Sequence, residues 1–264
     1  MKDVCIVSVV VGAKYKKFAN LFCYDYNIET GDHTNTRPVV ILVVDDYDGL
    51  NVSKYDFVTV KTLPEDALHD IDTGRTFGTG TVKNFDYSLK RFGYQAAIDA
   101  GYTDIIFIDM DMTIRKWDES VFDACTPPGL WAGRGYSSAG FGGGWPGKHV
   151  SDIKFTPKLR ALKKELDYET DWLNYKMPFE AVMYIAGVQK PVIQSFIDNW
   201  KIVSDATKLL NLPKNKVTHE IGLAADMCKL PIYFNKQLLS VVFKHYIMNH
   251  KALLNIHKAA FGDS

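Results

Sequence analysis

Three apolar segments rich in β-branched residues constrain the fold of this 264-residue chain most strongly. They span Val4–Val11, Pro38–Val44 and Asp104–Ile108, and none of them alternates apolar with polar residues. Unbroken apolar runs of this length are typical of strands that are buried on both faces of a sheet. Such strands occur where helices cover both faces of a parallel sheet, so the three segments predict an α/β fold.

The rest of the first half fits this prediction. Apolar spacing predicts helices at Tyr15–Tyr26 and Asn84–Ala100, the second closed by Gly101 as its cap. A weaker strand is predicted at Asp56–Val60, and the polar segment Asp66–Thr81 is interpreted as a loop. The order of strands and helices predicts a mainly parallel mixed sheet flanked by helices, with ligands bound at the carboxyl ends of its strands.

The second half has a different pattern. Gly129–Gly147 is rich in glycine and tryptophan, and we interpret it as a loop that closes over the site. Helices are expected at Thr156–Glu165, Val192–Leu210 and His219–Cys228, and strands at Phe179–Ile185, Pro231–Phe234 and Leu238–Tyr246. Because no repeat, linker or low-complexity tract interrupts the chain, we expect a single domain over residues 1–264.

Composition narrows the class of partners. Lys+Arg and Asp+Glu both number 31, so a net charge of zero argues against a general attraction to nucleic acid or anionic membranes. No apolar run approaches the roughly 20 residues of a transmembrane helix. Val4–Val11 is interpreted as a strand and not as a signal peptide. Four cysteines without metal-ligand spacing predict reduced thiols and a cytoplasmic location.

Acidic residues follow two of the predicted buried strands. Asp45 and Asp46 follow the second strand, and Asp109 and Asp111 follow the third. Two carboxylates separated by one residue at a strand end can converge on one hard cation, for which Mg²⁺ and Mn²⁺ are suited. Such a cation would neutralise the charge that develops on a nucleoside diphosphate leaving group.

Other classes of protein remain open at this point. The segment Asp109–Ile114 also resembles the D-x-D-x-T motif of haloacid-dehalogenase-type phosphatases, which implies Asp109 as nucleophile and Asp111 as acid/base. A nucleotidyltransferase would require a glycine-rich phosphate loop after the first strand, and Val11–Ala13 contains a single glycine. A non-catalytic carbohydrate-binding protein would bind sugars without nucleotide or metal.

Several segments together resemble GT-A glycosyltransferases, especially the glycogenin-like and blood-group-transferase-like families. These segments are Ser8–Tyr15, Asp45-Asp46, Asp109–Met112, Phe179–Gly187, Val217–Ile221 and His245–Lys251. The resemblance implies metal-dependent transfer of a sugar from a nucleoside-diphosphate sugar, most often a UDP-sugar, to an acceptor hydroxyl. It also implies a nucleotide-sugar-binding half at 1–112 and an acceptor-binding half at 113–264. The acceptor stays open between a glycan, a lipid, a protein and a modified DNA base.

The resemblance assigns roles to residues that would bind the donor. Tyr15 would stack on the nucleotide base, and Asp46 would contact the nucleotide from the second strand. A basic residue upstream of the aspartate pair would touch the donor, and the candidates are Lys83, Lys90 and Arg91.

The C-terminal segment would complete the site. His245 would join Asp109 and Asp111 as a metal ligand, and Lys251 would bind the diphosphate. The segment lacks the glycine and the Pro-Trp that are usual in glycogenin-like enzymes, so His250 and His257 are alternative ligands.

Two glutamates are candidates on the acceptor side. Glu220 would be the catalytic carboxylate near the anomeric carbon, or else an acidic residue in the first turn of a helix. Glu180 is a further candidate for acceptor contact.

Overall fold

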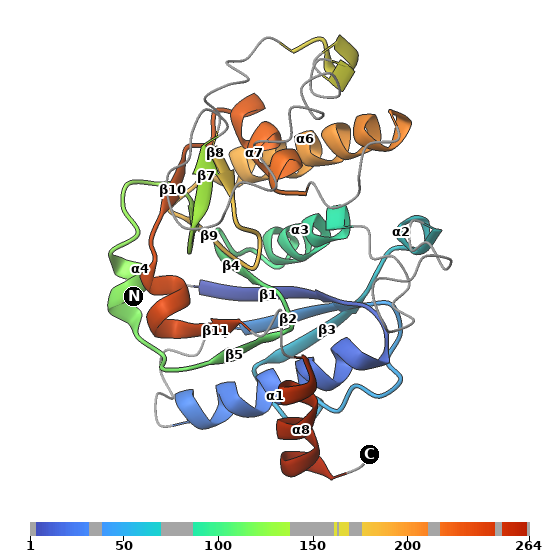
Figure 1. The fold of residues 1–264 in the computed structure, drawn as a ribbon, viewed down its shortest axis with the longest axis vertical. Helices are drawn as coiled ribbons and strands as arrows, with labels where there is room; N and C mark the ends of the chain where they lie inside the picture. Colours follow the sequence, from blue (N-terminus) through green and yellow to red (C-terminus); the bar gives the residue numbers. More distant parts are fainter. Residues whose placement is uncertain are drawn as a thin grey trace.

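A computed structural model describes residues 4–31, 39–69, 87–137, 161–162, 164–168, 176–210, 217–245 and 250–262 (Figure 1). Its centre is a seven-stranded sheet in the order β10-β6-β9-β4-β1-β2-β3. The strands are β1 (Val4–Val10), β2 (Val39–Val44), β3 (Val58–Thr62), β4 (Asp104–Ile108), β6 (Gly129–Ala132), β9 (Val182–Ala186) and β10 (Ile232–Phe234). All neighbouring pairs are parallel except the two made by β9, which runs antiparallel to β4 and β6. The predicted α/β fold with a mainly parallel mixed sheet is confirmed.

Helices and two small sheets surround this central sheet. The helices are α1 (Ala13–Thr30), α2 (Glu65–His69), α3 (Arg91–Asp99), α4 (Glu119–Asp123), α6 (Lys190–Leu209), α7 (Val217–Met227) and α8 (His250–Phe261), with a 3₁₀ turn η1 (Tyr87–Lys90) and a π-helix η3 (Leu238–Val242). The small sheets pair β5 (Met112–Ile114) with β11 (Phe243–His245) and β7 (Gly135–Ser137) with β8 (Lys176–Pro178). No helix in the described ranges has both the length and the apolar character needed to cross a membrane.

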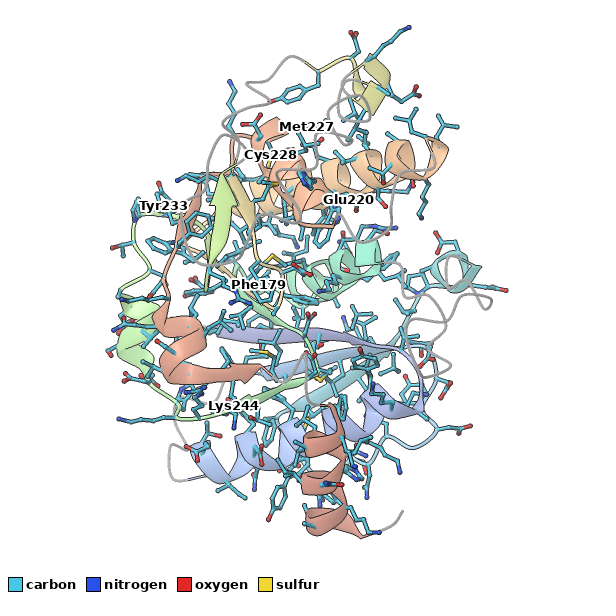
Figure 2. The ribbon with its side chains drawn as sticks, in the orientation of Figure 1. Phe179, Glu220, Met227, Cys228, Tyr233 and Lys244 are labelled. Carbon is cyan, nitrogen blue, oxygen red and sulfur yellow. The ribbon has the colours of Figure 1, made fainter. Side chains whose placement is uncertain are left out.

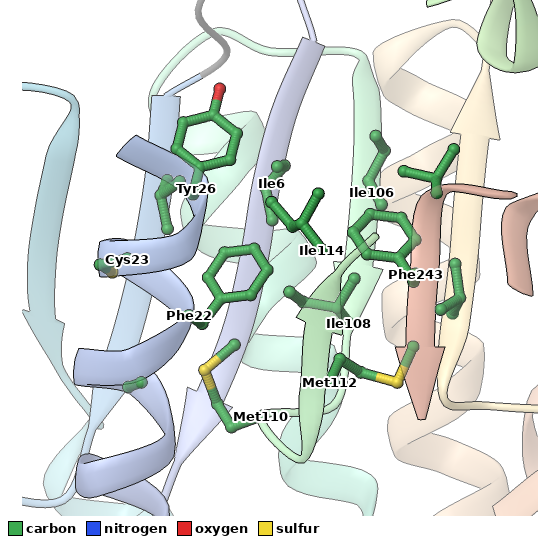
Figure 3. Close-up of a cluster of buried hydrophobic side chains, with 14 of the residues drawn as sticks. Ile6, Phe22, Cys23, Tyr26, Ile106, Ile108, Met110, Met112, Ile114 and Phe243 are labelled. Carbon is green, nitrogen blue, oxygen red and sulfur yellow. The ribbon is translucent and has the colours of Figure 1, made fainter. Parts of the chain in front are cut away.

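Both faces of the sheet are buried, because side chains of consecutive strand residues point to opposite faces. Ile6 belongs to a core that includes Phe22 of α1 and Phe243 of β11 (Figure 3). Its neighbour Val7 belongs to a second core, under α3, α6 and α7. Figure 1 shows α1 and α8 on one side of the sheet and α3 and α6 on the other. This two-sided burial explains why β1, β2 and β4 consist almost entirely of apolar residues.

The expected loop Gly129–Gly147 is wrong over its first part, where the chain forms β6 and β7. An ideal Cβ on Gly129 would lie 2.7 Å from the carbonyl oxygen of Pro231, and one on Gly133 would lie 2.5 Å from Leu239 Cγ. These glycines therefore allow close packing beside strands, which composition alone cannot separate from loop glycine. Residues 138–147 lie outside the described ranges.

The expected strand Leu238–Tyr246 is also wrong in its first half, where the chain forms η3 before β11. Leu238 and Val242 are both fully buried, and their spacing of four residues is that of one helical face and not of a strand. The side chain of Asn235 starts the turn, because its Oδ1 accepts a hydrogen bond from the N–H of Gln237 at 3.0 Å. Tyr246 lies outside the described residues.

Two smaller differences concern element ends, and one predicted helix is described only in part. The expected loop Asp66–Thr81 begins inside α2, whose first turn holds Glu65 and Asp66, as suits a helix N-terminus. The expected strand Phe179–Ile185 begins only at Val182, so residues 179–181 form a turn between β8 and β9. Of the expected helix Thr156–Glu165, the described residues 161–162 and 164–165 are helical, and 156–160 lie outside the described ranges.

Candidate active site

The turn after β4 carries the aspartate pair. The N–H of Asp109 donates a hydrogen bond of 2.9 Å to the carbonyl of Ala181, and Ser8 Oγ donates to the carbonyl of Ile108 at 2.7 Å. Met110 and Met112 are 2% and 1% exposed, and Figure 3 shows both within the cluster of buried hydrophobic side chains. The turn is thus fixed from β1, from the turn before β9 and from the core, at the carboxyl end of a central strand.

Asp109 forms a buried ion pair with Lys90. The Nζ atom of Lys90 lies 2.6 Å from Asp109 Oδ1, and the lysine side chain is 2% exposed. Gly93 allows α3 to approach the sheet so closely, since a Cβ there would lie 3.3 Å from Val7 Cγ2 and 3.4 Å from the ring of Phe107. Lys90 therefore reaches the strand end along the sheet-facing side of this helical segment.

The pKa of Asp109 reflects this crowded environment. The pKa is raised to about 6, mainly by burial; the positive charge of Lys90 opposes this rise, and the negative charges of Asp111 and Glu180 add to it. Lys90, Asp111 and Glu180 thus each act electrostatically on Asp109. Perturbed carboxylates of this kind are frequent at functional sites.

Asp111 also has a lysine nearby, which was not among the site residues predicted from the sequence. Lys14 lies in the first turn of α1, where burial lowers its pKa and the charge of Asp111 raises it. Its Nζ lies 5.7 Å from the centre of the Tyr15 ring and 5.8 Å from that of Phe18. The sequence signal was a basic residue in the first helical turn after a buried strand. Each aspartate of the pair is therefore accompanied by one lysine.

The turn after β1 and the end of β2 lie side by side, as the nucleotide-site prediction requires. Asp45 Oδ2 accepts a hydrogen bond from the N–H of Gly12 at 2.9 Å, and Lys16 forms ion pairs with both Asp45 and Asp46. Tyr15 packs edge-to-face on Phe18, with ring centres 5.6 Å apart. Asp46 is thus placed at the predicted edge, with its carboxylate engaged by Lys16.

The basic residues upstream of the aspartate pair differ in their positions. Arg91 is buried, and its Nη1 donates hydrogen bonds to the carbonyl and to the Oγ of Ser88, at 2.9 and 3.0 Å. It therefore folds back on η1, and Lys90 is the residue that meets Asp109. Lys83 lies outside the described residues.

The C-terminal histidines are separated by the fold. The pairing of β11 with β5 places His245 opposite Met112, so the backbone of His245 lies next to Asp111 in space. His257 is buried on α8, with its ring 4.9 Å from that of Phe261, and burial together with the charge of Lys17 on α1 lowers its pKa. The role of His245 as a metal ligand stays a prediction.

Two further residues of the C-terminal prediction lie on α8. This helix begins at His250, and Lys251 in its first turn is exposed. Lys251 is therefore accessible to a ligand, and its role toward a diphosphate stays a prediction.

The carboxylate of Glu220 is hydrogen-bonded to two side chains of α6. It is buried in the first turn of α7, where Oε1 accepts a hydrogen bond from Thr207 Oγ1 at 2.8 Å and Oε2 accepts one from Trp200 Nε1 at 3.4 Å. Both partners belong to α6, so this carboxylate joins the two helices (Figure 2). Its predicted catalytic role stays a prediction.

The residues at the aspartate pair fit a divalent cation. In the described part of the chain, no three His, Cys, Asp or Glu side chains already form a metal-ligand group. The donor set is nevertheless suitable, since the two carboxylates offer oxygen ligands and the backbone of His245 is held beside Asp111. A site of this kind would be completed by the phosphate oxygens of a substrate.

The fold is that of the GT-A glycosyltransferases. The galactosyltransferase LgtC, in complex with donor and acceptor sugar analogs, superposes with a TM-score of 0.50 and 8% identity over 96% of this chain and 95% of its own. Core-mannan synthase A from Aspergillus fumigatus, in a Mn/GDP form, gives 0.49 and 9% over 93% and 75% of the two chains. Mouse xyloside xylosyltransferase 1 gives 0.44 and 12% over 88% and 84%. No family model and no curated protein matches the sequence.

Proposed function

We propose that this protein is a metal-dependent glycosyltransferase, which moves a sugar from a nucleoside-diphosphate sugar to an acceptor hydroxyl. The observation that carries the proposal is the aspartate pair at the carboxyl end of β4, in a GT-A fold, with Lys90 and Lys14 beside it. Carboxylates and ammonium groups together suit a cation and a diphosphate in one site. A UDP-sugar is the proposed donor, and a cytoplasmic location is proposed with it.

Asp109, Asp111 and His245 would hold Mn²⁺ or Mg²⁺ in this site. When bound, the cation would neutralise the charge that develops on the leaving diphosphate. Lys14 and Lys251 would bind the diphosphate as point charges, because a lysine ammonium can contact phosphate oxygens from several directions. Tyr15 and Asp46 would bind the nucleoside at the neighbouring strand ends, in the proposed donor half at 1–112.

A panel of nucleotide sugars tests this proposal, assayed for release of nucleoside diphosphate with Mn²⁺ and a mixture of acceptors. We expect turnover that is lost in excess chelator. Asp111→Asn should lose both turnover and Mn²⁺-dependent nucleotide binding in calorimetry. The matched control is Asp205→Asn, because Asp205 forms an exposed ion pair with Lys201 on α6.

Two results would contradict the proposal. The first is full activity in chelator. The second is phosphate release from a simple phosphomonoester that is lost on Asp109→Asn, which would favour the phosphatase alternative.

A further inference from the structure

We infer that Glu180, and not Glu220, is the carboxylate that contacts the transferred sugar in this enzyme. The inference rests on the proposed glycosyltransferase function and deepens it. It assigns to Glu180 a hydrogen bond from a sugar hydroxyl and stabilisation of the positive charge that develops at the anomeric carbon.

The first argument is position. Glu180 lies in the turn between β8 and β9, and the next residue, Ala181, accepts the hydrogen bond from the N–H of Asp109 at 2.9 Å. The preceding residue, Phe179, donates its N–H to the carbonyl of Arg134 at 2.9 Å, and the Arg134 guanidinium lies 4.1 Å from the centre of the Phe179 ring. The turn is thus fixed at both sides, directly beside the aspartate pair.

The second argument is reach. Glu180 is bonded to Ala181, whose carbonyl accepts the N–H of Asp109, so the Glu180 side chain starts beside the turn that carries the aspartate pair. A sugar attached to a diphosphate at Asp109 and Asp111 would therefore lie within reach of Glu180.

The third argument is hydrogen bonding. The Oε2 atom of Glu180 is buried and has no hydrogen-bond partner among the described residues. A buried carboxylate oxygen without a donor is unfavourable, and a hydroxyl group of a bound sugar would supply that donor. The half-buried Arg134, whose guanidinium lies over the Phe179 ring, is a second polar group near this turn.

Glu220 differs from Glu180 in its hydrogen bonds. Both of its oxygens accept hydrogen bonds from α6, from Thr207 and from Trp200. To contact a substrate through its carboxylate, Glu220 would have to give up these hydrogen bonds. Its carboxylate therefore has the contacts of a residue that joins two helices.

The test compares Glu180→Gln with the wild-type enzyme and with Glu119→Gln, which removes an exposed glutamate in the first turn of α4. Turnover, donor KM, and the affinities for the nucleotide sugar and for the nucleoside diphosphate alone are measured. We expect kcat to fall about a hundredfold or more in Glu180→Gln. The affinity for the nucleotide sugar should fall, while the affinity for the diphosphate stays unchanged because that ligand lacks the sugar. Glu119→Gln should match the wild type.

A second variant separates a role in the site from a role in folding. Glu180→Asp keeps the charge, so we expect it to recover part of the turnover that Glu180→Gln loses, and circular dichroism reports whether each variant is folded.

Three results would overturn the inference. They are a wild-type kcat in Glu180→Gln, a loss of kcat that occurs in Glu220→Gln alone, and equal losses of affinity for diphosphate and nucleotide sugar. If the wild-type enzyme itself turns over no nucleotide sugar, the proposed function fails, and the two binding measurements still decide the role of Glu180.

Discussion

Removing Lys90 is the sharpest test of how the aspartate pair is held. Lys90→Met keeps the length and apolar contacts of the side chain while it deletes the charge that lies 2.6 Å from Asp109. Removal of one partner from a buried ion pair costs about 3–5 kcal/mol, because the other charge is left buried and uncompensated. The Asp109 side chain is 24% exposed and can be partly hydrated, so we expect a loss near the lower end, about 3 kcal/mol.

The loss should depend on pH. The pKa of Asp109 is already raised in the folded protein, and without Lys90 it should rise further above the value of about 3.9 in the unfolded chain. For a carboxyl group with a raised folded pKa, the cost of burying the charge is present above that pKa and disappears below it. The difference in unfolding free energy between variant and wild type should therefore be larger at pH 8 than at pH 5.

The assay is urea unfolding followed by tryptophan fluorescence at both pH values. The matched control is Lys201→Met, which breaks an ion pair of the same 2.6 Å length to Asp205. That pair is exposed, with side-chain exposures of 59% and 51%, so its loss should cost less than about 1 kcal/mol. Equal costs for Lys90→Met and Lys201→Met, or a loss that does not change with pH, would refute the reasoning.

Further predictions concern the packing at Gly129 and the residues of the C-terminal segment. Gly129→Ala should lower the unfolding free energy by about 1–3 kcal/mol in urea titrations, since its Cβ would meet a backbone carbonyl at 2.7 Å; a change near zero would contradict this. His245→Ala should weaken Mn²⁺ affinity in calorimetry about tenfold or more, whereas His257→Ala should lower stability because its ring is buried. Unchanged Mn²⁺ affinity in His245→Ala would argue for another ligand, and Lys251→Ala tests the diphosphate contact in the same titration.

The sequence predicted the strands of the first half best. Val4–Val11 and Asp104–Ile108 are almost entirely apolar, which is typical of strands buried on both faces, and the structure has strands there with nearly the same bounds. The position of Asp109 and Asp111 at a strand end followed from the same pattern. The predicted loop in the second half was wrong at its start, because Gly129 and Gly133 allow close packing beside strands.

The sequence could not decide which of two neighbouring polar residues contacts the aspartate pair. Lys90 and Arg91 are adjacent, and only the approach of α3 to the sheet at Gly93 decides which of them meets Asp109. Helical periodicity offered a signal, since Lys90 lies three residues before Gly93 and so shares its face. The partners of Glu220 were not visible at all, because they belong to α6 and become its neighbours through tertiary packing alone.

The position of β9 between β4 and β6 has a consequence for synthesis on the ribosome. The strands β1, β2, β3 and β4 leave the ribosome well before β9, which lies far later in the chain. Until β9 pairs with it, β4 is the edge of a nascent four-stranded sheet, with unpaired backbone groups along an apolar segment. Such an edge is open to pairing with other chains, and the single charged residue of β4 is Asp104 at its first position. The strand that ends at the aspartate pair is thus the strand that a chaperone would have to protect during translation.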